Sequence, residues 1–317
     1  MSKKVYIFSG ESYMVNESLK KLKTGLGIEH PEFNITEFKT MPKAKELIEA
    51  CSSVPFMSDL RLVAVSDCLV ITSKGSTDEA KSIADFIPGI PETTALALLT
   101  YEPLDKRRSI YSQVKKYGEV KEFLPPGRKE CIAFVRRKAK EYGADISAKA
   151  ASELVAAAGC DYYALEGEAA KLAAYSGYSE ITETHVRECA SKSLEYSVFE
   201  IHGLLINRQA AKAKSLLEDI LRSERPEGLV GLIARKIRDM YRMKAMADFG
   251  YSVSKAAAVL GCKSFAAEMI LKESKRFSQQ ELRCALVSLA DLDYGIKSGG
   301  KDAYFALPET IFKIYKL

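Results

Sequence analysis

The chain has 317 residues, of which 47% are apolar and 28% are charged, and its formal net charge is +5. This balance excludes disordered and fibrous proteins, and the length predicts two or three domains. No apolar run is long enough to span a membrane, and the start MSKKVYIFSGES lacks the apolar core and cleavage site of a signal peptide. We therefore expect a cytoplasmic protein that does not bind membranes.

The positive surplus lies entirely in the carboxy-terminal part of the chain. Lys plus Arg balance Asp plus Glu at 17 each through residue 126 and at 10 each over 127–193, whereas 20 face 15 from residue 194 onward. A surplus of this size fits a surface that faces phosphates, but it fits a solvated helical region as well. Charge alone therefore does not predict DNA binding.

The cysteines and histidines do not form the pattern of a catalytic or metal site. No two cysteines have CxxC spacing, and no histidine has a Cys, Asp or Glu partner at metal-ligand spacing. We expect buried, reduced thiols, no metal ion and no catalytic triad. The residues concerned are Cys51, Cys68, Cys131, Cys160, Cys189, Cys262, Cys284, His30, His185 and His202.

The first 126 residues alternate short β-rich runs with helical stretches. The candidate strands are KVYIFSG, NITEFKT, RLVAVSD, TALALLTY and VKEFLP. Runs such as LVAV and ALALL are apolar on both faces, as strands are when helices cover both sides of a parallel sheet. An α/β parallel-sheet domain is therefore predicted over residues 1–126, and it ends where the tandem prolines of Pro125-Pro126-Gly127 deny backbone donors.

The loop after the first predicted strand, GESYMVNESLKKLK, resembles a phosphate-binding P-loop in position but not in residues. When the pattern GxxxxGK[ST] starts at Gly10, the second glycine falls on Val15, the lysine on Asn16 and the hydroxyl residue on Glu17. Glu11 and Glu17 would also repel phosphate. The loop thus lacks its flexibility, its cation and its metal ligand, so we expect no bound nucleotide and no other cofactor.

A single acidic residue, Asp67, follows the third predicted strand, RLVAVSD. Nucleotide-hydrolysing sites use acid pairs at such a place to position magnesium and water. One acid after a strand is more often a turn or cap residue, so Asp67 favours a structural role. An ATPase with an unorthodox loop stays as an alternative, and it would require Lys20 or Lys21 for tight nucleotide binding.

An unusual apolar segment, SSVPFMSDLR, lies between a predicted helix ending near Cys51 and the third predicted strand. Pro55 disfavours helix, and Phe56 and Met57 are followed at once by polar residues. One interpretation is structural: Phe56 plugs the sheet edge and Met57 fills a gap. The other is functional, since aromatic and methionine side chains on a rigid loop serve as anchors in protein interfaces.

From residue 128 onward the apolar residues recur with the period of a helix, and no strand is predicted. Four short helices are expected over 128–141, 147–158, 162–176 and 182–192, which form a small all-α domain over 127–193. The expected N-caps are Ser147 and Thr182, and the expected stops are Gly143, Gly159 and Gly177.

A second and longer helical set begins near Val198 and predicts another all-α domain over 194–317. Turn-forming residues interrupt it at Arg225-Pro226, Gly250, Gly261, Ser278 and Gly299-Gly300.

Two basic segments are candidates for contact with the DNA backbone. The first is RKECIAFVRRKAK over 128–140, and the second is RKIRDMYRMK over 235–244, in which Arg235, Arg238 and Arg242 share one helical face. Such faces are usually only solvated. Tyr241 is the one interleaved aromatic residue and the chain has no tryptophan, so any DNA contact is expected to involve phosphates rather than stacked bases.

Four local patterns, in this order and spacing, give the whole chain a family resemblance. They are IFSGESYMVNESL, VPFMSDLRLVAV, DYYALEGEAAKLAAY with Glu168 and Lys171, and the late pair LEYSVFEIHGLL and LADLDYGIKSG. Together they resemble the delta subunit of the bacterial DNA polymerase III clamp loader. The resemblance implies an AAA+-like α/β domain without a working P-loop, a helical lid domain and a helical collar that assembles with other loader subunits.

The resemblance also implies a function. Delta subunits do not hydrolyse ATP; they bind the ring-shaped sliding clamp and open it, as accessory subunits of a DNA-directed DNA polymerase. The family grips the clamp with apolar residues before the third strand, which correspond here to Val54, Pro55, Phe56 and Met57. Pro55 stands where some members have a larger aliphatic residue, so the pair that forms the wedge is left open.

The partners that the resemblance implies are the sliding clamp, the other loader subunits and the backbone of primer-template DNA. A freestanding helical DNA-binding protein is the second alternative, and a shift assay without partners would distinguish it by its salt dependence.

Overall fold

A computed structural model describes residues 4–262 and 264–316, with the side chains of residues 223, 264 and 265 left out. The chain divides into two compact units. The first comprises residues up to Phe134 together with Cys160–Tyr163, and the second comprises Val135–Gly159 and Ala164–Leu317. The division into three domains at 126 and 193 stays a prediction.

The first unit contains a five-stranded sheet in which every pairing is parallel. Its strands are β1 (Val5–Gly10), β2 (Ile35–Phe38), β3 (Arg61–Val65), β4 (Thr94–Thr100) and β5 (Glu119–Phe123), in the spatial order β2-β3-β4-β1-β5. In the centre, Ile7 pairs with Leu98 and Val63 with Leu96. All five strands were expected from the sequence, which confirms the predicted α/β parallel-sheet class.

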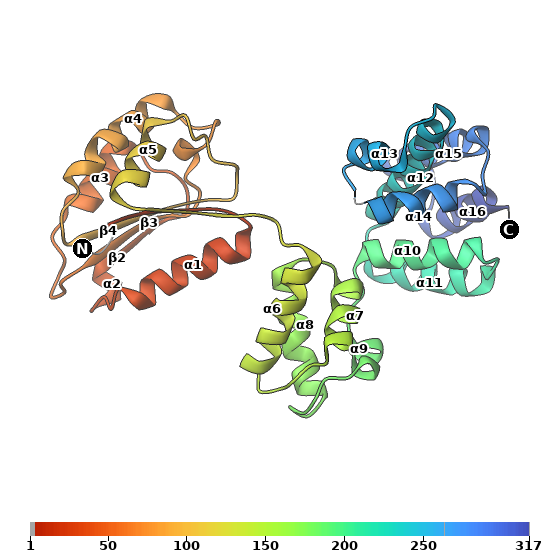
Figure 1. Cartoon of the computed structure of the whole chain (residues 1–317), viewed down its shortest axis with the longest axis horizontal. Helices are drawn as coiled ribbons and strands as arrows, with labels where there is room; N and C mark the ends of the chain where they lie inside the picture. The colour runs from red at the N-terminus through yellow and green to blue at the C-terminus, as the bar shows by residue number, and fades with distance from the viewer. Residues whose placement is uncertain (1–3, 263, 317) are drawn as a thin grey trace. The chain divides into compact units, whose positions relative to one another are not determined.

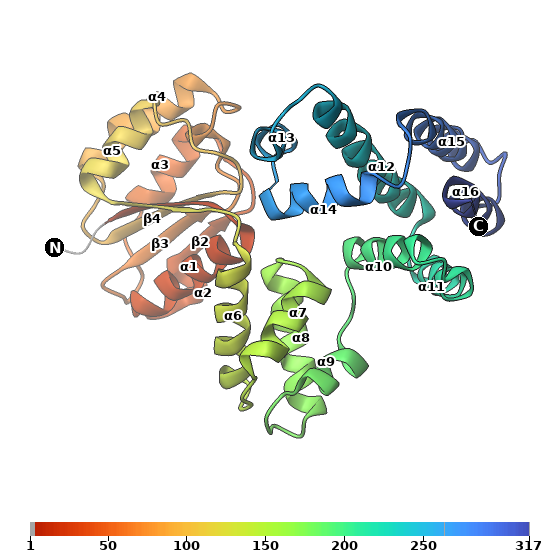
Figure 2. The same ribbon diagram turned by 45° about the vertical axis from the view of Figure 1, so that its right-hand side comes forward.

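Helices cover both faces of the sheet, as Figures 1 and 2 show. On one face lie α1 (Ser12–Gly25) and the single turn α2 (Pro31–Asn34); on the other lie α3 (Ala44–Ser52), α4 (Thr77–Phe86) and α5 (Ser109–Tyr117). Short 3-10 turns occur at Leu69–Ile71 and Ile87–Gly89. Because successive side chains of a strand point to opposite faces, each face has its own core.

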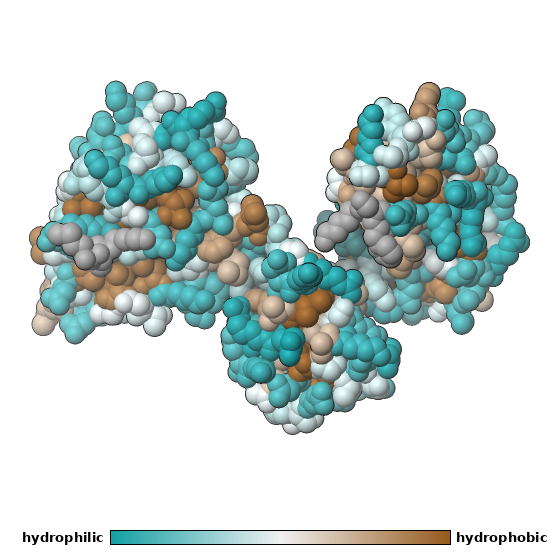
Figure 3. Space-filling model, viewed as in Figure 1, coloured by the Kyte–Doolittle hydropathy of each residue, from teal (hydrophilic) through white to brown (hydrophobic). Residues whose placement is uncertain are grey.

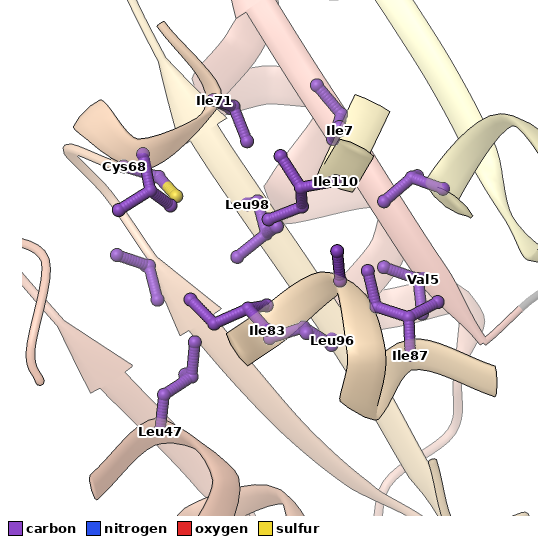
Figure 4. Close-up of a cluster of buried hydrophobic side chains, with 14 of the residues drawn as sticks. Val5, Ile7, Leu47, Cys68, Ile71, Ile83, Ile87, Leu96, Leu98 and Ile110 are labelled. Carbon is purple, nitrogen blue, oxygen red and sulfur yellow. The ribbon is translucent and has the colours of Figure 1, made fainter. Parts of the chain in front are cut away.

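The larger core lies between the sheet and α3, α4 and α5, and Figure 4 shows it. Strand residues such as Ile7 and Leu98 meet Leu47, Ile83 and Ile110 from the three helices, and all of them are buried. The second core consists of the alternate strand residues with Val15 and Leu19 of α1. Apolar packing on both faces of the sheet thus stabilises the first unit.

Four helices follow the sheet: α6 (Arg128–Glu141), α7 (Ala148–Ala158), α8 (Tyr162–Tyr175) and α9 (Glu183–Cys189). The Ser147 hydroxyl accepts a hydrogen bond from the Ala150 amide, and the Thr182 hydroxyl accepts one from the His185 amide, so both expected N-caps are confirmed. The expected stops Gly143, Gly159 and Gly177 all have positive φ, between 63° and 88°. This backbone conformation favours glycine.

The last of these helices is shorter than expected, because it ends at Cys189 rather than at residue 192. The Ser191 amide donates to Oε2 of Glu168 at 3.0 Å, and the Lys171 ammonium donates both to the Ser191 hydroxyl, at 3.0 Å, and to Glu168, at 2.8 Å. A tertiary contact therefore takes the backbone donor that a longer helix would need. This contact gives Glu168 and Lys171, which belong to one of the four patterns of the family resemblance, a structural role.

The remaining helices form the carboxy-terminal bundle. They are α10 (Leu194–Ile206), α11 (Ala210–Ser223), α12 (Pro226–Asp248), α13 (Val253–Leu260), α14 (Ser264–Ser274), α15 (Gln279–Lys297) and α16 (Ala303–Tyr315). Most of these helices end near the expected turn-forming residues, but the break between α10 and α11 at residues 207–209 was not expected, and α10 begins at Leu194 rather than near Val198. Leu205, Ile237, Leu289 and Ile311, from four different helices, lie in one buried cluster. The expected all-α character after the sheet is confirmed.

A polar cluster is buried within this bundle. His202 of α10 is 3% exposed; its Nδ1 is hydrogen-bonded to the Tyr315 hydroxyl, and its Nε2 lies 3.2 Å from Oε2 of Glu273. Lys236 Nζ lies 2.7 Å from the same oxygen. The contacts at Glu273 have ion-pair distances but not aligned hydrogen-bond geometry. Burial opposes ionisation of Glu273, but His202 and Lys236 outweigh it and lower its pKa to about 2.

Because of this cluster, we expect the bundle to lose stability in acid. Burial lowers the pKa of His202, so the fold favours neutral imidazole. The stability that this preference contributes is complete above about pH 6.5, the pKa of histidine in an unfolded chain, and it is lost as the pH falls below that value. Glu273 adds a loss of the same sign below about pH 4.5. The urea concentration at the midpoint of unfolding should be lower at pH 5.5 than at pH 7.5. The difference between these two midpoints should be smaller for His202→Gln than for the wild type.

The expectation of uniformly buried thiols is wrong in part. Cys51, Cys68 and Cys131 are buried, but Cys160 and Cys284 are exposed. Burial raises the pKa of Cys51 and Cys68 to about 12, which keeps these thiols protonated and unreactive. The positions of the cysteines in the sequence exclude a CxxC pair, but they do not show whether each cysteine is buried or exposed.

No helix among the described residues is long and apolar enough to cross a membrane.

Candidate functional site

The loop after β1 is fixed by its backbone against the end of β5. Gly10 has φ of 104°, and a Cβ there would lie 1.9 Å from the Phe123 carbonyl oxygen. The next amide, that of Glu11, donates to the same oxygen at 2.9 Å. Only glycine fits this position, so Gly10 serves the strand-to-helix turn.

The carboxylate of Glu11 occupies the amino end of α1. It accepts hydrogen bonds from the backbone amides of Tyr13, at 3.0 Å, and Met14, at 2.9 Å. In phosphate-binding loops such amides, together with the helix dipole, bind the anionic ligand. Here a side chain of the protein fills the position of the anion.

Removal of this cap should measurably destabilise the first unit. Glu11→Ala is expected to lower its free energy of unfolding by about 1 kcal/mol, the usual cost of losing an N-cap, whereas Glu11→Asp retains a capping carboxylate. Urea denaturation of both variants checks the expectation. Equal stability of the alanine variant and the wild type would contradict the role assigned to Glu11.

The other residues of the P-loop frame also have structural contacts. Val15 is fully buried in the core beneath α1. The Asn16 amide donates to the Tyr163 hydroxyl at 2.7 Å and accepts from the Tyr101 hydroxyl at 3.1 Å. Glu17 lies 4.0 Å from Lys20, four-fifths of whose side chain is exposed. Asp67 follows β3, in the bend before the turn at Leu69–Ile71.

The apolar turn, defined here as Val54, Pro55, Phe56 and Met57, joins α3 to β3. Val54 is 85% exposed, Met57 70% and Phe56 54%, whereas Pro55 is half-buried. The interpretation in which Phe56 plugs the sheet edge is therefore not supported. Figure 3 shows one face of the chain, on which brown hydrophobic areas interrupt a largely teal surface. Large exposed apolar side chains grouped on one loop are typical of an interaction site.

Two residues that the sequence did not single out lie against the apolar turn. Phe33 of α2 is 62% exposed, and its ring meets that of Phe56 edge-on with 5.3 Å between centroids. Asn34 is completely buried and is hydrogen-bonded to both backbone groups of Phe56. The segment HPEFN, in which an aromatic and an amide residue closely follow a proline, is a signal of an unusual loop. Nothing in the local sequence, however, connects Asn34 with Phe56, which lies 22 residues further along the chain.

The two basic segments differ in how far their charges are paired. In α6, Lys138 Nζ lies 2.8 Å from Glu141 and 2.7 Å from Glu166, and Arg137 lies 3.5 Å from Glu141. In α12, the three predicted arginines are exposed along one face, and no ion pair involves them among the residues described. They are Arg235, Arg238 and Arg242.

One of these arginines, Arg242, borders an apolar hollow of about 690 Å³ at the end of α12. The hollow is lined mainly by Tyr241, Met246, Phe249 and Val259, and Phe249 is 84% exposed. Exposure of this kind is unfavourable for an isolated chain and is typical of a surface that another protein covers.

Comparison with known proteins shows the family of the chain. Residues 6–124 match the family model "DNA polymerase III, delta subunit", and residues 195–314 match "DNA polymerase III delta subunit, C-terminal domain". The chain is 26% identical to the DNA polymerase III subunit delta of Bacillus subtilis over 320 residues, covering 98% of this chain and 92% of the relative. The solved structure of the Bacillus subtilis DNA clamp loader delta protein matches with a TM-score of 0.71 at 25% identity, covering 100% of this chain and 96% of that one. The chain belongs to the DNA polymerase III delta-subunit family, as the sequence motifs indicated.

Proposed function

We propose that this chain is the non-catalytic subunit of a replicative clamp loader that binds the sliding clamp and opens it during DNA replication. The observation that carries the proposal is the apolar turn, which presents Val54, Phe56 and Met57 to solvent from a rigid α/β unit of a delta-family member. Aromatic anchors on a fixed loop bury a large area at a low entropic cost, as interface hot spots do.

The role of Glu11 supports a function without nucleotide chemistry. Its carboxylate already accepts from the amides at the start of α1, and a phosphate entering there would meet this negative charge instead of free donors. We therefore expect energy from ATP to enter the complex through other subunits. The alternative of an unorthodox ATPase requires tight ATP binding by the isolated chain, lost on replacement of Lys20 or Lys21, and titration tests it directly.

The carboxy-terminal bundle is proposed as the collar through which the chain assembles with the other loader subunits. The apolar hollow with the exposed Phe249 supports this role, because such a surface is stabilised when a second protein covers it. A cytoplasmic location follows from the proposed part in replication.

The test of the proposed function is reconstitution from purified parts. The chain should bind the sliding clamp without ATP, co-purify with the ATP-binding loader subunit, and support ATP-dependent loading of the clamp onto primed circular DNA. Omission of the chain should abolish loading. A chain that binds neither the clamp nor the ATP-binding subunit would overturn the proposal.

Contact with the backbone of primer-template DNA is proposed for Arg235, Arg238 and Arg242. In the assembled loader, Arg238→Ala should weaken DNA binding uniformly across sequences and reduce the slope of log affinity against log salt by about 1. Arg107→Ala is the control, because Arg107 belongs to neither basic segment and is paired with Asp105 at 2.9 Å. An unchanged salt slope for Arg238→Ala would contradict the contact.

A freestanding DNA-binding protein is the remaining alternative. It would shift DNA on its own and with a steep dependence on salt, whereas the proposed subunit should bind DNA well only within the assembled loader.

A further inference from the structure

The side chain of Asn34 joins two loops that are far apart in the sequence. Its Nδ2 donates to the carbonyl oxygens of Glu29 and Phe56, each at 2.8 Å, and its Oδ1 accepts from the Phe56 amide at 2.7 Å. The residue is completely buried. Because one amide side chain satisfies both backbone groups of Phe56, it fixes the position from which the Phe56 ring projects.

The backbone around this contact is held in an unfavourable conformation. Met57 has φ of 46° and His30 has φ of 49°, values in the left-handed region that residues with a Cβ seldom adopt. Such conformations persist only where the surrounding structure enforces them, and they often occur at binding sites. A second link, from the Glu29 amide to the Ser58 hydroxyl at 3.3 Å, closes the same two loops.

The second loop also adds an exposed aromatic ring. Phe33 directly precedes Asn34 and places its ring edge-on against that of Phe56. Both rings are more than half exposed. Two aromatic rings in this arrangement form one continuous apolar ridge rather than two isolated side chains.

We propose that the clamp-binding surface consists of two segments, the apolar turn and Phe33, and that Asn34 is the residue that positions them. This inference rests on the proposed clamp-binding function of the turn. The partner it fits is an apolar pocket on the clamp that is wide enough for two rings inclined at 61° to each other. A surface that is already ordered in the free chain loses little conformational freedom on binding, which strengthens affinity without new contacts.

The contribution of Phe33 can be measured with the full chain and purified clamp. Phe33→Ala should raise the dissociation constant about tenfold, since it removes a half-exposed aromatic contact next to the main anchor. Phe33→Leu should retain most of the affinity. Phe305→Ala is a matched control, because Phe305 of α16 is also exposed but belongs to the carboxy-terminal bundle.

The positioning role of Asn34 calls for a double-mutant cycle with Phe56. Asn34→Asp keeps the size of the side chain but replaces the two donated hydrogen bonds by an oxygen that faces two carbonyl oxygens. It should weaken clamp binding about tenfold in the wild-type background and clearly less in the Phe56→Ala background, because much of its effect is exerted through the backbone of Phe56. Circular dichroism and urea unfolding establish that each variant is folded.

The outcomes separate this inference from the function on which it rests. If Phe56→Ala abolishes binding while folded Phe33→Ala and Asn34→Asp chains bind as the wild type does, the two-segment surface is overturned and the proposed function stands. If folded Phe56→Ala itself binds the clamp normally, the inference is overturned and the binding surface lies elsewhere on the chain, whereas a wild-type chain that does not bind the clamp overturns the proposed function. If Asn34→Asp does not fold, Phe33→Ala alone decides, and normal binding of that variant overturns the inference.

Discussion

Phe56→Ala is expected to weaken binding of the sliding clamp by about 2 to 4 kcal/mol, roughly 30- to 700-fold in dissociation constant. The ring is the central aromatic group of the apolar turn, and its backbone is fixed by Asn34. Since the side chain is only half-buried in the free chain, its loss should cost less than about 1 kcal/mol of folding stability. Calorimetric titration of the variant with purified clamp gives the affinity, and urea unfolding gives the stability.

The neighbours of Phe56 decide which residues complete the anchor. Alanine at Val54, at Pro55 and at Met57 should each have a smaller effect than alanine at Phe56, and the largest of the three identifies the second member of the pair. Phe305→Ala should leave the affinity unchanged. A folded Phe56→Ala chain that binds the clamp with wild-type affinity would place the binding surface elsewhere on the molecule.

Glu273→Ala is expected to lower the free energy of unfolding of the carboxy-terminal bundle by about 2 to 3 kcal/mol. The carboxylate is the common partner of Lys236 and His202, and its removal leaves a largely buried ammonium without its counter-charge. The effect should be smaller than for a fully enclosed pair, because one-fifth of the Lys236 side chain still reaches water. Urea unfolding at pH 7.5, followed by far-ultraviolet circular dichroism, measures the loss.

Two variants test whether this loss comes from the buried charge. Glu273→Gln keeps the volume but not the charge, so most of the loss should persist. Glu218→Ala removes a carboxylate whose pair with Lys214, at 3.8 Å, is exposed to solvent, and it should change the stability by less than about 0.5 kcal/mol. Equal effects of Glu218→Ala and Glu273→Ala would show that burial of the cluster contributes nothing.

The sheet could be predicted because its strands are apolar on both faces and are separated by turn-forming residues. The run TALALLTY, for instance, became β4, all seven residues of which are buried. The single helical turn α2 has four residues, too few to show a period, so no pattern revealed it. The last helix before the bundle ends early because of a contact with Glu168, which local propensity does not include.

Of the two segments of the candidate site, only the apolar turn could be predicted from the sequence. The apolar turn is a local anomaly, since large apolar residues stand between proline and polar residues, and it can be recognised in the sequence alone. Asn34 cannot be recognised in this way, because its role depends on hydrogen bonds that cross two loops and on burial. The same reason applies to Asn16, whose tyrosine partners come from distant parts of the chain.

The carboxylate at the start of α1 has a consequence for regulation. The Glu11 carboxylate belongs to the chain, so its effective concentration at the amino end of α1 does not depend on the concentration of any solute in the cell. If an anion at this position sets the conformation of the unit, Glu11 holds that unit permanently in one state, whatever the level of ATP. If the first unit binds the clamp as proposed, we expect it to be constitutively competent, so that control of its access to the clamp comes from neighbouring subunits.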